Sequence, residues 1–432
     1  MIGNMEYESR NWIWGEVCLS PHFVGGIVLT AALAGLSTGY FGWVGVTQIP
    51  IMWPGFGILQ KRERAKKPIR VFIDGCFDLM HYGHANALRQ AKALGDELVV
   101  GVISDEGITV NKGPPVFSME ERLALVNGLK WVDEVIPVTP YMLTEELMKS
   151  LLNEHKIDYI VHGDDPCILQ DGTDAYALAK RAGRYRQIKR TEGVSSTDIV
   201  GRILSTMKDN SSSEDKSSFT LNGDLYEGKD VSKKIRNKIA PVSHFLPTSR
   251  RIVQFSNGKG PGPNSRVVYI DGAFDLFHVG HVEILKKARQ LGDFLLVGIY
   301  MDQTISEIRG AQYPLMNMHE RTLSVLACRH VDEVIIGAPW QVTKDMITTF
   351  NISLVVRGTV SEPNPLSDEL DDPYAVPKSM GIFRMLESPK DLTTFSVAQR
   401  IFANHEAYMK RNAEKAKSEM KYYEGKMFVS ED

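Results

Sequence analysis

The chain has 432 residues and a formal net charge of −3. This length fits two domains of ordinary size plus a smaller segment, and the slightly acidic balance gives nucleic-acid binding no compositional support. The four cysteines, at positions 18, 76, 167 and 328, are scattered. This spacing is typical of reduced thiols in a cytosolic setting rather than of a disulfide framework or a zinc site.

The N-terminal segment is apolar and uncharged over an unusual length. No Lys, Arg, Asp or Glu occurs in residues 17–60, and the 24 residues 23–46 are rich in Gly, Ala, Leu, Val and aromatic residues. Such a stretch is long enough to cross a bilayer, and basic residues follow it between Lys61 and Lys67. The positive-inside rule therefore predicts a transmembrane helix within an anchor and basic linker over residues 1–68, with the remainder in the cytosol. The membranes considered are the mitochondrial outer membrane and the endoplasmic reticulum, and the alternative is an apolar helix docked on the domains.

A strand followed by a helix is predicted next, with two histidines between them. The apolar run 70–73 predicts a buried strand, and residues 85–94 have the periodicity of a helix. His81 and His84 form a His-x-Gly-His tetrad where the strand passes into the start of the helix. Free backbone amides and the helix dipole favour phosphate at such a place, and Gly83 lets a phosphate approach the backbone. Histidines that only cap the helix, or that hold a metal, are the alternatives.

Further along the chain, polar residues follow other predicted strands. Residues 97–103 predict a second strand of a parallel sheet, and His162-Gly163 follows the apolar run 157–161. Open α/β sheets bind ligands at the carboxyl ends of their strands. Lys112-Gly113 lies on a loop rich in glycine and proline, where the lysine is either a ligand for phosphate or only a solvated charge.

Residues 190–197 read Arg-Thr-Glu-Gly-Val-Ser-Ser-Thr and precede another predicted helix. A guanidinium fork and hydroxyl groups suit the binding of phosphate. A simple helix cap is the alternative, and the two readings are compatible because both use the free amides of the first helical turn.

Three further side chains are of types that bind cations. Asp105 follows the second strand and suits an ammonium group, whereas Trp131 and Tyr141 offer ring faces to a cation. Trp131 has an ordinary core position as its alternative.

The whole pattern occurs twice. The tetrad returns as His278-Val279-Gly280-His281, 197 residues after the first, and residues 290–299 match residues 93–102 at the same offset. Ordered matches of this kind predict two domains of the same fold, at 69–207 and 265–405, joined by an exposed linker at 208–264. Residues 406–432 are predicted to be a charged, solvated helical tail.

The second copy departs from the first where phosphate would bind. Arg309-Gly310 stands in place of Lys112-Gly113, and Arg357-Gly358 replaces His162-Gly163. The segment 388–395 keeps two threonines but lacks counterparts of Arg190 and Gly193. Because arginine is not equivalent to lysine at a phosphate, the first domain is predicted to be the main catalyst and the second a nucleotide-binding support.

The tetrad, Lys112-Gly113 and residues 190–197 together resemble the cytidylyltransferase family. The last segment is similar to the family's Arg-Thr-x-Gly-x-Ser-Thr-Thr/Ser motif, with Ser196 in place of a threonine. The tandem arrangement resembles the ethanolamine-phosphate branch of that family over about residues 69–405. The resemblance implies an α/β fold with two tandem Rossmann-like nucleotidylyltransferase domains and parallel sheets. It also implies that CTP and phosphoethanolamine yield CDP-ethanolamine and pyrophosphate, with Mg²⁺ entering on CTP.

The resemblance also assigns roles to residues. The catalytic residues it implies are His81, His84, Lys112, Arg190 and Thr191. The CTP-binding residues it implies in the first domain are Cys76, Phe77, His81, His84, His162, Gly163, Ser195, Ser196 and Thr197. Those in the second domain are Ala273, Phe274, His278, His281, Arg309, Arg357, Gly358, Thr393 and Thr394. No protein-held metal is predicted. Choline phosphate or glycerol 3-phosphate as acceptor, an adenylyltransferase, and a non-catalytic nucleotide sensor are the alternatives, and a homo-oligomer is left open.

Overall fold

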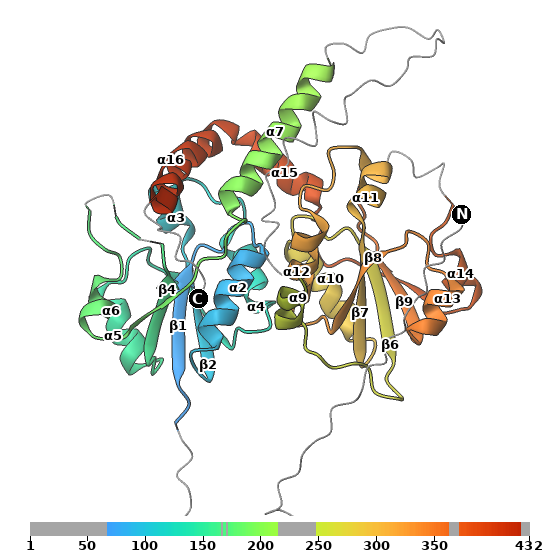
Figure 1. Cartoon of the computed structure of the whole chain (residues 1–432), viewed down its shortest axis with the longest axis horizontal. Coiled ribbons are helices and arrows are strands. Elements are labelled where there is room, and N and C mark those ends of the chain that lie inside the picture. The colour runs from blue at the N-terminus through green and yellow to red at the C-terminus, as the bar shows by residue number, and fades with distance from the viewer. Residues whose placement is uncertain (1–66, 166, 170–171, 215–247, 363–370, 425–432) are drawn as a thin grey trace, which may run out of the picture. The chain divides into compact units, whose positions relative to one another are not determined.

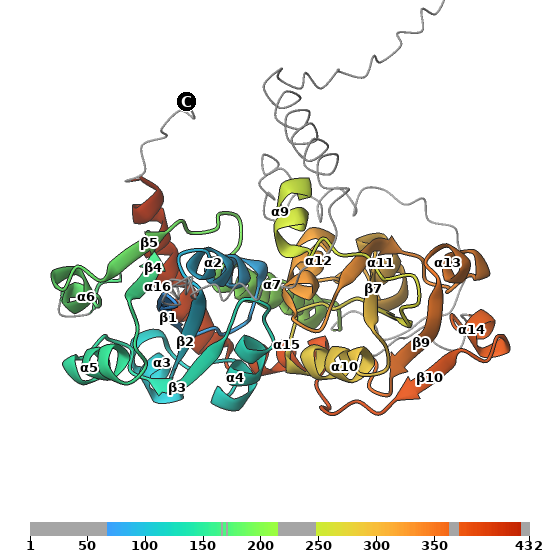
Figure 2. The ribbon, with the colours of Figure 1, turned by 90° about the horizontal axis from the view of Figure 1, so that it is seen from below.

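The computed structural model describes residues 67–165, 167–169, 172–214, 248–362 and 371–424. These residues form two five-stranded parallel sheets, each with helices on both faces (Figures 1 and 2). The predicted pair of tandem α/β domains is confirmed. The predicted N-terminal anchor lies outside the described residues, and none of the helices in the described ranges combines the length and apolar character needed to span a bilayer.

The first domain places the tetrad at the point where its sheet changes direction. Its elements are β1 (Arg70–Gly75), α2 (Tyr82–Lys92), β2 (Glu97–Ile103), α3 (Asp105–Lys112), α4 (Met119–Asn127), β3 (Glu134–Thr139), α5 (Glu145–Asn153), β4 (Tyr159–Gly163), α6 (Ala177–Arg181), β5 (Tyr185–Ile188) and α7 (Ser196–Glu214). The strand order is β3-β2-β1-β4-β5. The chain first adds strands on one side of β1 and then returns to add β4 on the other. The carboxyl ends of β1 and β4 therefore flank a switch point, which is where open α/β sheets bind ligands.

The second domain repeats this topology. Its elements are α9 (Thr248–Phe255), β6 (Val267–Gly272), α10 (Val279–Arg289), β7 (Phe294–Tyr300), α11 (Asp302–Arg309), α12 (Met318–Ala327), β8 (Glu333–Ala338), α13 (Lys344–Thr349), β9 (Ile352–Gly358), α14 (Ala375–Ser379), β10 (Phe383–Leu386), α15 (Thr394–Ala403) and α16 (His405–Glu424). The strand order is β10-β9-β6-β7-β8. β6 and β9 therefore correspond to β1 and β4, and the second tetrad follows β6.

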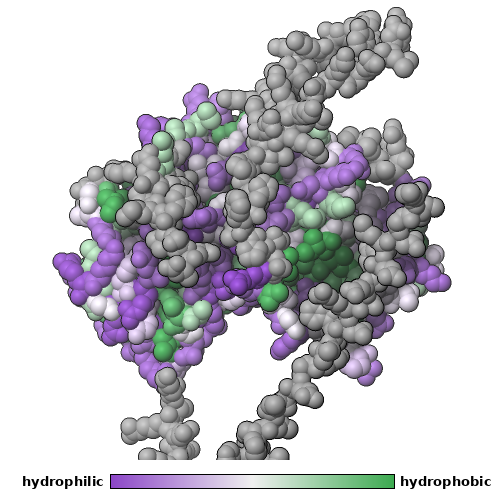
Figure 3. Space-filling model, viewed as in Figure 1, coloured by the Kyte–Doolittle hydropathy of each residue, from purple (hydrophilic) through white to green (hydrophobic). Residues whose placement is uncertain are grey.

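Continuous apolar runs form the central strands because helices cover both faces of each sheet. Every residue of β7 is buried, and so are residues 98–103 of β2. Strands of parallel sheets buried on both faces need no alternation of polar and apolar residues. On the face shown in Figure 3, hydrophilic residues predominate and apolar side chains gather in small groups.

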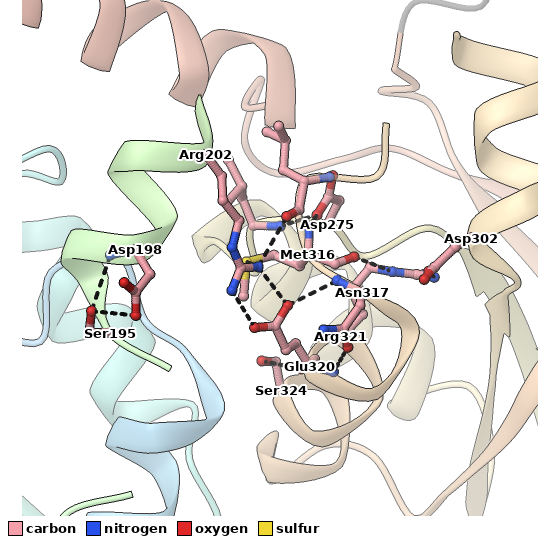
Figure 4. Close-up of polar contacts among 12 residues, drawn as sticks. Ser195, Asp198, Arg202, Asp275, Asp302, Met316, Asn317, Glu320, Arg321 and Ser324 are labelled. Carbon is pink, nitrogen blue, oxygen red and sulfur yellow. Dashed lines mark hydrogen bonds and ion pairs between the residues drawn. The ribbon is translucent and has the colours of Figure 1, made fainter. Parts of the chain in front are cut away.

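The two domains contact each other through pairs of residues that correspond between the repeats. Arg202 of α7 makes a bidentate ion pair with Glu320 of α12, at 2.8 and 2.9 Å (Figure 4). Arg400 of α15 makes the corresponding pair with Glu121 of α4, at 2.8 and 3.0 Å. Each domain therefore holds the start of a helix in the other through the same kind of contact.

A second set of reciprocal contacts marks the local pseudo-twofold axis. The backbone amide of Lys130 donates to Ala327 O, and that of Arg329 donates to Gly128 O. An isolated antiparallel bridge joins Leu129 and Cys328 between these bonds. Like the ion pairs, these bonds map onto each other when the two repeats are exchanged.

Two predicted boundaries differ from the structure. α7 continues to Glu214, and α9 begins at Thr248 inside the predicted linker, with Phe255 of α9 buried. The predicted solvated tail begins as the packed helix α16, whose Tyr408 is 1% exposed. A charge-rich composition gave no sign that one side of this helix is covered, because charged residues such as Arg411 take part in the packing.

Candidate functional site

A strained loop joins β1 to the tetrad in the first domain. Phe77 and Leu79 have φ angles of 49° and 48°, a conformation that side chains other than glycine rarely adopt. The corresponding Phe274 and Leu276 have φ angles of 49° and 44°. Strain repeated in both domains indicates that this loop shape is required at the site, since such residues persist only where their surroundings hold them.

A buried carboxylate holds each of these loops. Asp78 accepts hydrogen bonds from the amides of Val116 and Phe117, at 3.0 Å each. Asp275 accepts the corresponding bonds from Leu315 and Met316, at 2.7 and 2.8 Å. Neither aspartate was among the residues predicted from the sequence, although their recurrence in both copies of the motif was a usable signal.

The rings of the tetrad histidines lie against each other at the start of α2, tilted by 31°. The ring centroids of His81 and His84 lie 4.0 Å apart, and His81 Nδ1 accepts a hydrogen bond from Gly83 N at 3.1 Å. In the neutral ring the proton therefore resides on His81 Nε2, which is left as a donor. A Cβ atom at Gly83 would lie 2.8 Å from His81 and 2.9 Å from Val194, so glycine permits the close packing of the tetrad against residues 190–197.

Burial keeps both imidazoles neutral when no anion is bound. It lowers the pKa of His84 to about 4, and the nearby cations Lys112 and Arg190 add to this effect. The pKa of His81 is also well below its ordinary value, for which burial is the largest cause and His84 the next. The pKa of His84 further indicates that Lys112 and Arg190 both lie close enough to its ring to act on it.

Lys112 ends α3 and lies beside two other predicted site residues. Its Nζ lies 3.5 Å from Cys76 Sγ and 5.5 Å from the centre of the Tyr141 ring. The neighbouring Cys76 sulfur raises the pKa of Lys112, so this side chain is a cation at neutral pH. Gly113 follows with a φ of 90°, which allows the chain to turn directly after the lysine.

Residues 190–197 lie across the switch point from Lys112. Arg190 N donates to Asp164 Oδ1 at 2.8 Å, and Thr191 Oγ1 accepts from Asn86 Nδ2 of α2 at 2.9 Å. Ser195 Oγ accepts from Asp198 N at 3.1 Å, and Ser196 Oγ donates to Asp78 O at 3.1 Å. Helix capping by Ser195 is therefore present, as the alternative reading expected. The amides at the start of α7 face the same switch point.

His162 lies at the carboxyl end of β4, with its ring against that of a tyrosine. Its ring centroid is 4.5 Å from that of Tyr176, whose hydroxyl donates to Asp74 Oδ1 at 2.6 Å. In the second domain Arg357 lies 5.4 Å from the Tyr374 ring, and the Tyr374 hydroxyl donates to Asp271 Oδ1 at 2.6 Å. This tyrosine–aspartate pair lies beside the switch point in both domains and was not found from the sequence.

Of the three predicted acceptor residues, one lies away from the switch point and a second already has protein partners. Trp131 precedes β3, at the amino ends of the strands, and packs edge-to-face against Phe255 with centroids 5.0 Å apart. It therefore belongs to the contact between the domains and not to the site. Asp105 already accepts from Arg122 Nη2 at 2.6 Å and from Met119 N at 3.2 Å. Because Asp302 and Arg321 form the same pair in the second domain, this pair supports the fold. Tyr141 alone lies with the catalytic group.

The second domain contains a cavity of about 740 Å³ at its switch point. All nine second-domain residues that the sequence predicted for nucleotide binding line it: Ala273, Phe274, His278, His281, Arg309, Arg357, Gly358, Thr393 and Thr394. The rings of His278 and His281 stack with centroids 3.8 Å apart. Burial lowers the pKa of His278 to about 3, so this pair is also neutral.

Helix α16 extends from the second domain to the first site. Arg411 lies 3.7 Å from Asp78 Oδ2 and 3.5 Å from Pro114 O, measured from its Nη1 atom. Asn412 Nδ2 donates to Thr197 O at 3.0 Å. The C-terminal helix thus contacts both the segment that follows Lys112 and the start of α7.

We expect Arg411→Ala to lower turnover by about three- to tenfold, because small displacements of positioned groups cost rate. The reason is that Arg411 contacts the segment carrying Lys112 without reaching the reacting atoms. Steady-state kinetics check this expectation. Lys410→Ala, an exposed neighbour, is the matched control and should leave turnover unchanged. Equal effects of the two substitutions would contradict a positioning role for Arg411.

The low pKa of His84 predicts that protons are taken up when CTP binds. The free protein favours neutral His84, so this group contributes stability above about pH 6.5 that is lost as the pH falls toward 4. A bound triphosphate favours the imidazolium and raises the pKa. Calorimetry in buffers with different ionisation enthalpies should therefore show a contribution of proton uptake by His84 between pH 6 and 7.

His84→Ala should reduce that uptake. His155→Ala is the matched control, because His155 pairs with Glu134 at the amino end of β3. Uptake that is unchanged in His84→Ala would show that His84 does not contact the phosphates.

Comparison with known proteins agrees with this geometry. The profile of the family described as "Cytidylyltransferase-like" matches residues 72–202 and 269–401. Over 373 residues the chain is 65% identical to an ethanolamine-phosphate cytidylyltransferase of Arabidopsis thaliana, covering 85% of this chain and 88% of that protein. It is 50% identical to a protein of the same name from Dictyostelium discoideum, covering 83% and 98%, and 46% identical to one from Mus musculus, covering 82% and 91%. With one site of this geometry at the switch point of each repeat and relatives matched over most of its length, the chain belongs to the cytidylyltransferase family.

Proposed function

We propose that the chain transfers the cytidylyl group of CTP to phosphoethanolamine, giving CDP-ethanolamine and pyrophosphate. The observation that carries this assignment is the grouping of His81, His84, Lys112 and Arg190 at one switch point. The likeness to ethanolamine-phosphate cytidylyltransferases over 85% of the chain identifies the acceptor.

The reaction requires positioning and charge neutralisation rather than a covalent intermediate. A phosphate oxygen of phosphoethanolamine attacks the α-phosphorus of CTP, and the bond to pyrophosphate breaks. The Nε2–H of His81 and the first amides of α7 donate to phosphate oxygens, while Lys112 neutralises charge between the two substrates. Donors fixed in place before the reaction need no reorganisation as charge moves, which lowers the barrier.

The first domain is proposed as the catalyst, and the second as a nucleotide-binding support. Support for this division comes from the phosphate-binding positions. Arg190 has no cationic counterpart at Ser388, and Gly193, with a φ of 80°, is replaced by Asp391. The ion pair between Arg202 and Glu320 connects the second domain to α7, the helix that begins at the first site.

An acceptor assay tests the proposed function. The purified chain is supplied with CTP or ATP and, in turn, with phosphoethanolamine, choline phosphate or glycerol 3-phosphate, and pyrophosphate release is measured. We expect turnover with CTP and phosphoethanolamine only. Preference for another acceptor would change the substrate, and CTP binding without pyrophosphate release for any acceptor would favour a nucleotide sensor.

We also propose that Mg²⁺ enters with CTP. Among the described residues no group of three or more His, Cys, Asp or Glu side chains forms a metal site. The proposal rests on the general behaviour of Mg²⁺ at nucleotides, where phosphate oxygens and water hold most of the ion. Titration of the acceptor assay with EDTA and Mg²⁺ measures this dependence.

Membrane attachment through residues 23–46 is the remaining proposal. It rests on 24 consecutive uncharged residues followed by basic ones. We expect the full chain in cells to resist carbonate extraction, and its C-terminus to be open to cytosolic protease. A chain lacking residues 1–60 should be soluble and active, because every site residue lies beyond position 66. Release of the full chain by carbonate would favour a helix docked on the domains, and organelle fractionation decides between the two candidate membranes.

A further inference from the structure

A carboxylate of the chain lies where the second domain would bind phosphate. Glu362 Oε2 is 2.7 Å from Arg309 Nη2, and its Oε1 accepts from Thr394 N at 2.5 Å. A longer contact joins Glu362 Oε2 to Phe395 N at 3.4 Å. One carboxylate therefore receives a guanidinium and the first two amides of helix α15.

These donors occupy positions that correspond to the proposed phosphate-binding positions of the first domain. Arg309 corresponds to Lys112, and Thr394 and Phe395 correspond to Ser196 and Thr197 at the start of α7. Both Ser196 and Thr394 donate their hydroxyl to the backbone of the loop that precedes the tetrad, at 3.1 and 3.0 Å. A helix start with a cation beside it binds carboxylate and phosphate through the same donors.

The cavity beyond Glu362 has unused capacity for an anion. His278 is 2% exposed and lines the cavity, and within the described structure its Nε2 is buried without a hydrogen-bond partner. Arg309 Nη1 is likewise buried and unpaired, although Nη2 of the same side chain binds Glu362. Buried polar atoms usually have partners, so these two indicate that the site can accommodate a larger anion than one carboxylate.

We propose that Glu362 is a resident anion that competes with nucleotide phosphate for the second domain. This inference rests on the proposed nucleotide-binding role of that domain. A nucleoside triphosphate reaches Arg309 and the α15 amides only when the carboxylate leaves them. The apparent dissociation constant is then the intrinsic one divided by the fraction of molecules in which the position is free. The second domain is thereby held as a weak nucleotide site.

The test uses the full chain and CTP, with binding followed by calorimetry. Glu362→Gln keeps the shape of the side chain and removes its charge. We expect it to tighten CTP binding at the second site by about 10- to 100-fold, the range expected if Glu362 occupies the position in about 90–99% of molecules. The second site of this variant should also bind inorganic pyrophosphate more tightly, because Glu362 competes for the position of the phosphate.

Two further variants test whether the tighter CTP binding arises at the second site and through Glu362. Glu387→Gln removes an exposed carboxylate of the same domain outside the cavity and should change nothing. Adding His281→Ala to Glu362→Gln should remove the gained binding while leaving the first site intact. Thermal melting with and without pyrophosphate shows that each variant is folded. If Glu362→Gln fails to fold, Glu362→Asp, whose shorter side chain reaches the donors less well, should tighten binding to a smaller degree.

Unchanged CTP and pyrophosphate affinity in a folded Glu362→Gln chain would overturn the inference. Tight binding of two CTP molecules by the unmodified chain would overturn it equally. CDP-ethanolamine formation is measured on the same samples. If Glu362→Gln binds CTP more tightly but no sample, including the unmodified chain, forms CDP-ethanolamine, the proposed function is refuted. The competition between Glu362 and phosphate would still be established.

Discussion

Lys112→Ala should lower turnover by about 10²–10³-fold, the usual loss when one preorganised group at a transferred phosphate is removed. Lys112 is the cation that ends α3, and its side chain is exposed to the position that the substrates would take. It makes only a 3.5 Å contact with Cys76 and a ring contact with Tyr141, so its loss should not unfold the domain. The measurement is kcat for CDP-ethanolamine formation, together with the melting temperature.

The repeat supplies a matched control for Lys112. Arg309→Ala removes the corresponding cation from the second domain and should leave kcat close to that of the unmodified chain. Two outcomes would contradict our assignment. A normally melting Lys112→Ala chain that keeps more than about a tenth of its turnover would remove Lys112 from the catalytic group. A greater loss in Arg309→Ala than in Lys112→Ala would make the second domain the catalyst.

Arg202→Ala should destabilise the chain by about 3–5 kcal/mol, the cost of leaving a buried partner of an ion pair uncompensated. Glu320 is 3% exposed and receives both nitrogens of the Arg202 guanidinium (Figure 4). Without Arg202, the Glu320 carboxylate loses its charged partner and keeps, among its described side-chain contacts, only the hydrogen bond from Asn317 N. Urea unfolding followed by circular dichroism measures the change.

Breaking the corresponding ion pair on the other side of the pseudo-twofold axis should cost less stability. The side chain of Arg400 is 40% exposed and that of Glu121 is 19% exposed. Solvent screens such a pair, so Arg400→Ala should cost about 0–1 kcal/mol. Equal losses in the two variants would show that burial of the glutamate does not determine the strength of these contacts.

The sequence predicted the parts of the site that recur in both repeats. The tetrads, the cation that ends α3 or α11, and the hydroxyls at the start of α7 or α15 were all found, since each is a local pattern beside an apolar strand. The nine second-domain residues that line one cavity show how far this reasoning extends. The topology then gathers these patterns at one place, because the carboxyl ends of the parallel strands β1 and β4 lie side by side.

Contacts between segments far apart in the chain could not be predicted from local sequence patterns. Trp131 looked like a cation-binding ring because no local pattern predicts its packing against Phe255, 124 positions along the chain. Asp105 was given an ammonium partner because its bond to Arg122 depends on how α4 is placed. The roles of Glu362 and Arg411 arise in the same way, from tertiary placement rather than from spacing along the chain.

The reciprocal contacts between the repeats have a consequence for how the two halves can differ. In a symmetric dimer of identical chains, every substitution at an isologous interface appears twice, once on each side of the axis. Here the two sides are encoded separately, so a change at Glu320 leaves Glu121 untouched. One half can therefore bury its ion pair while the other leaves its pair in solvent. The same independence allows one switch point to keep Lys112 and the other to hold arginine and a carboxylate. Joining the two halves in one chain thus permits a pseudodimer with two unlike sites, which a symmetric dimer of identical chains does not have.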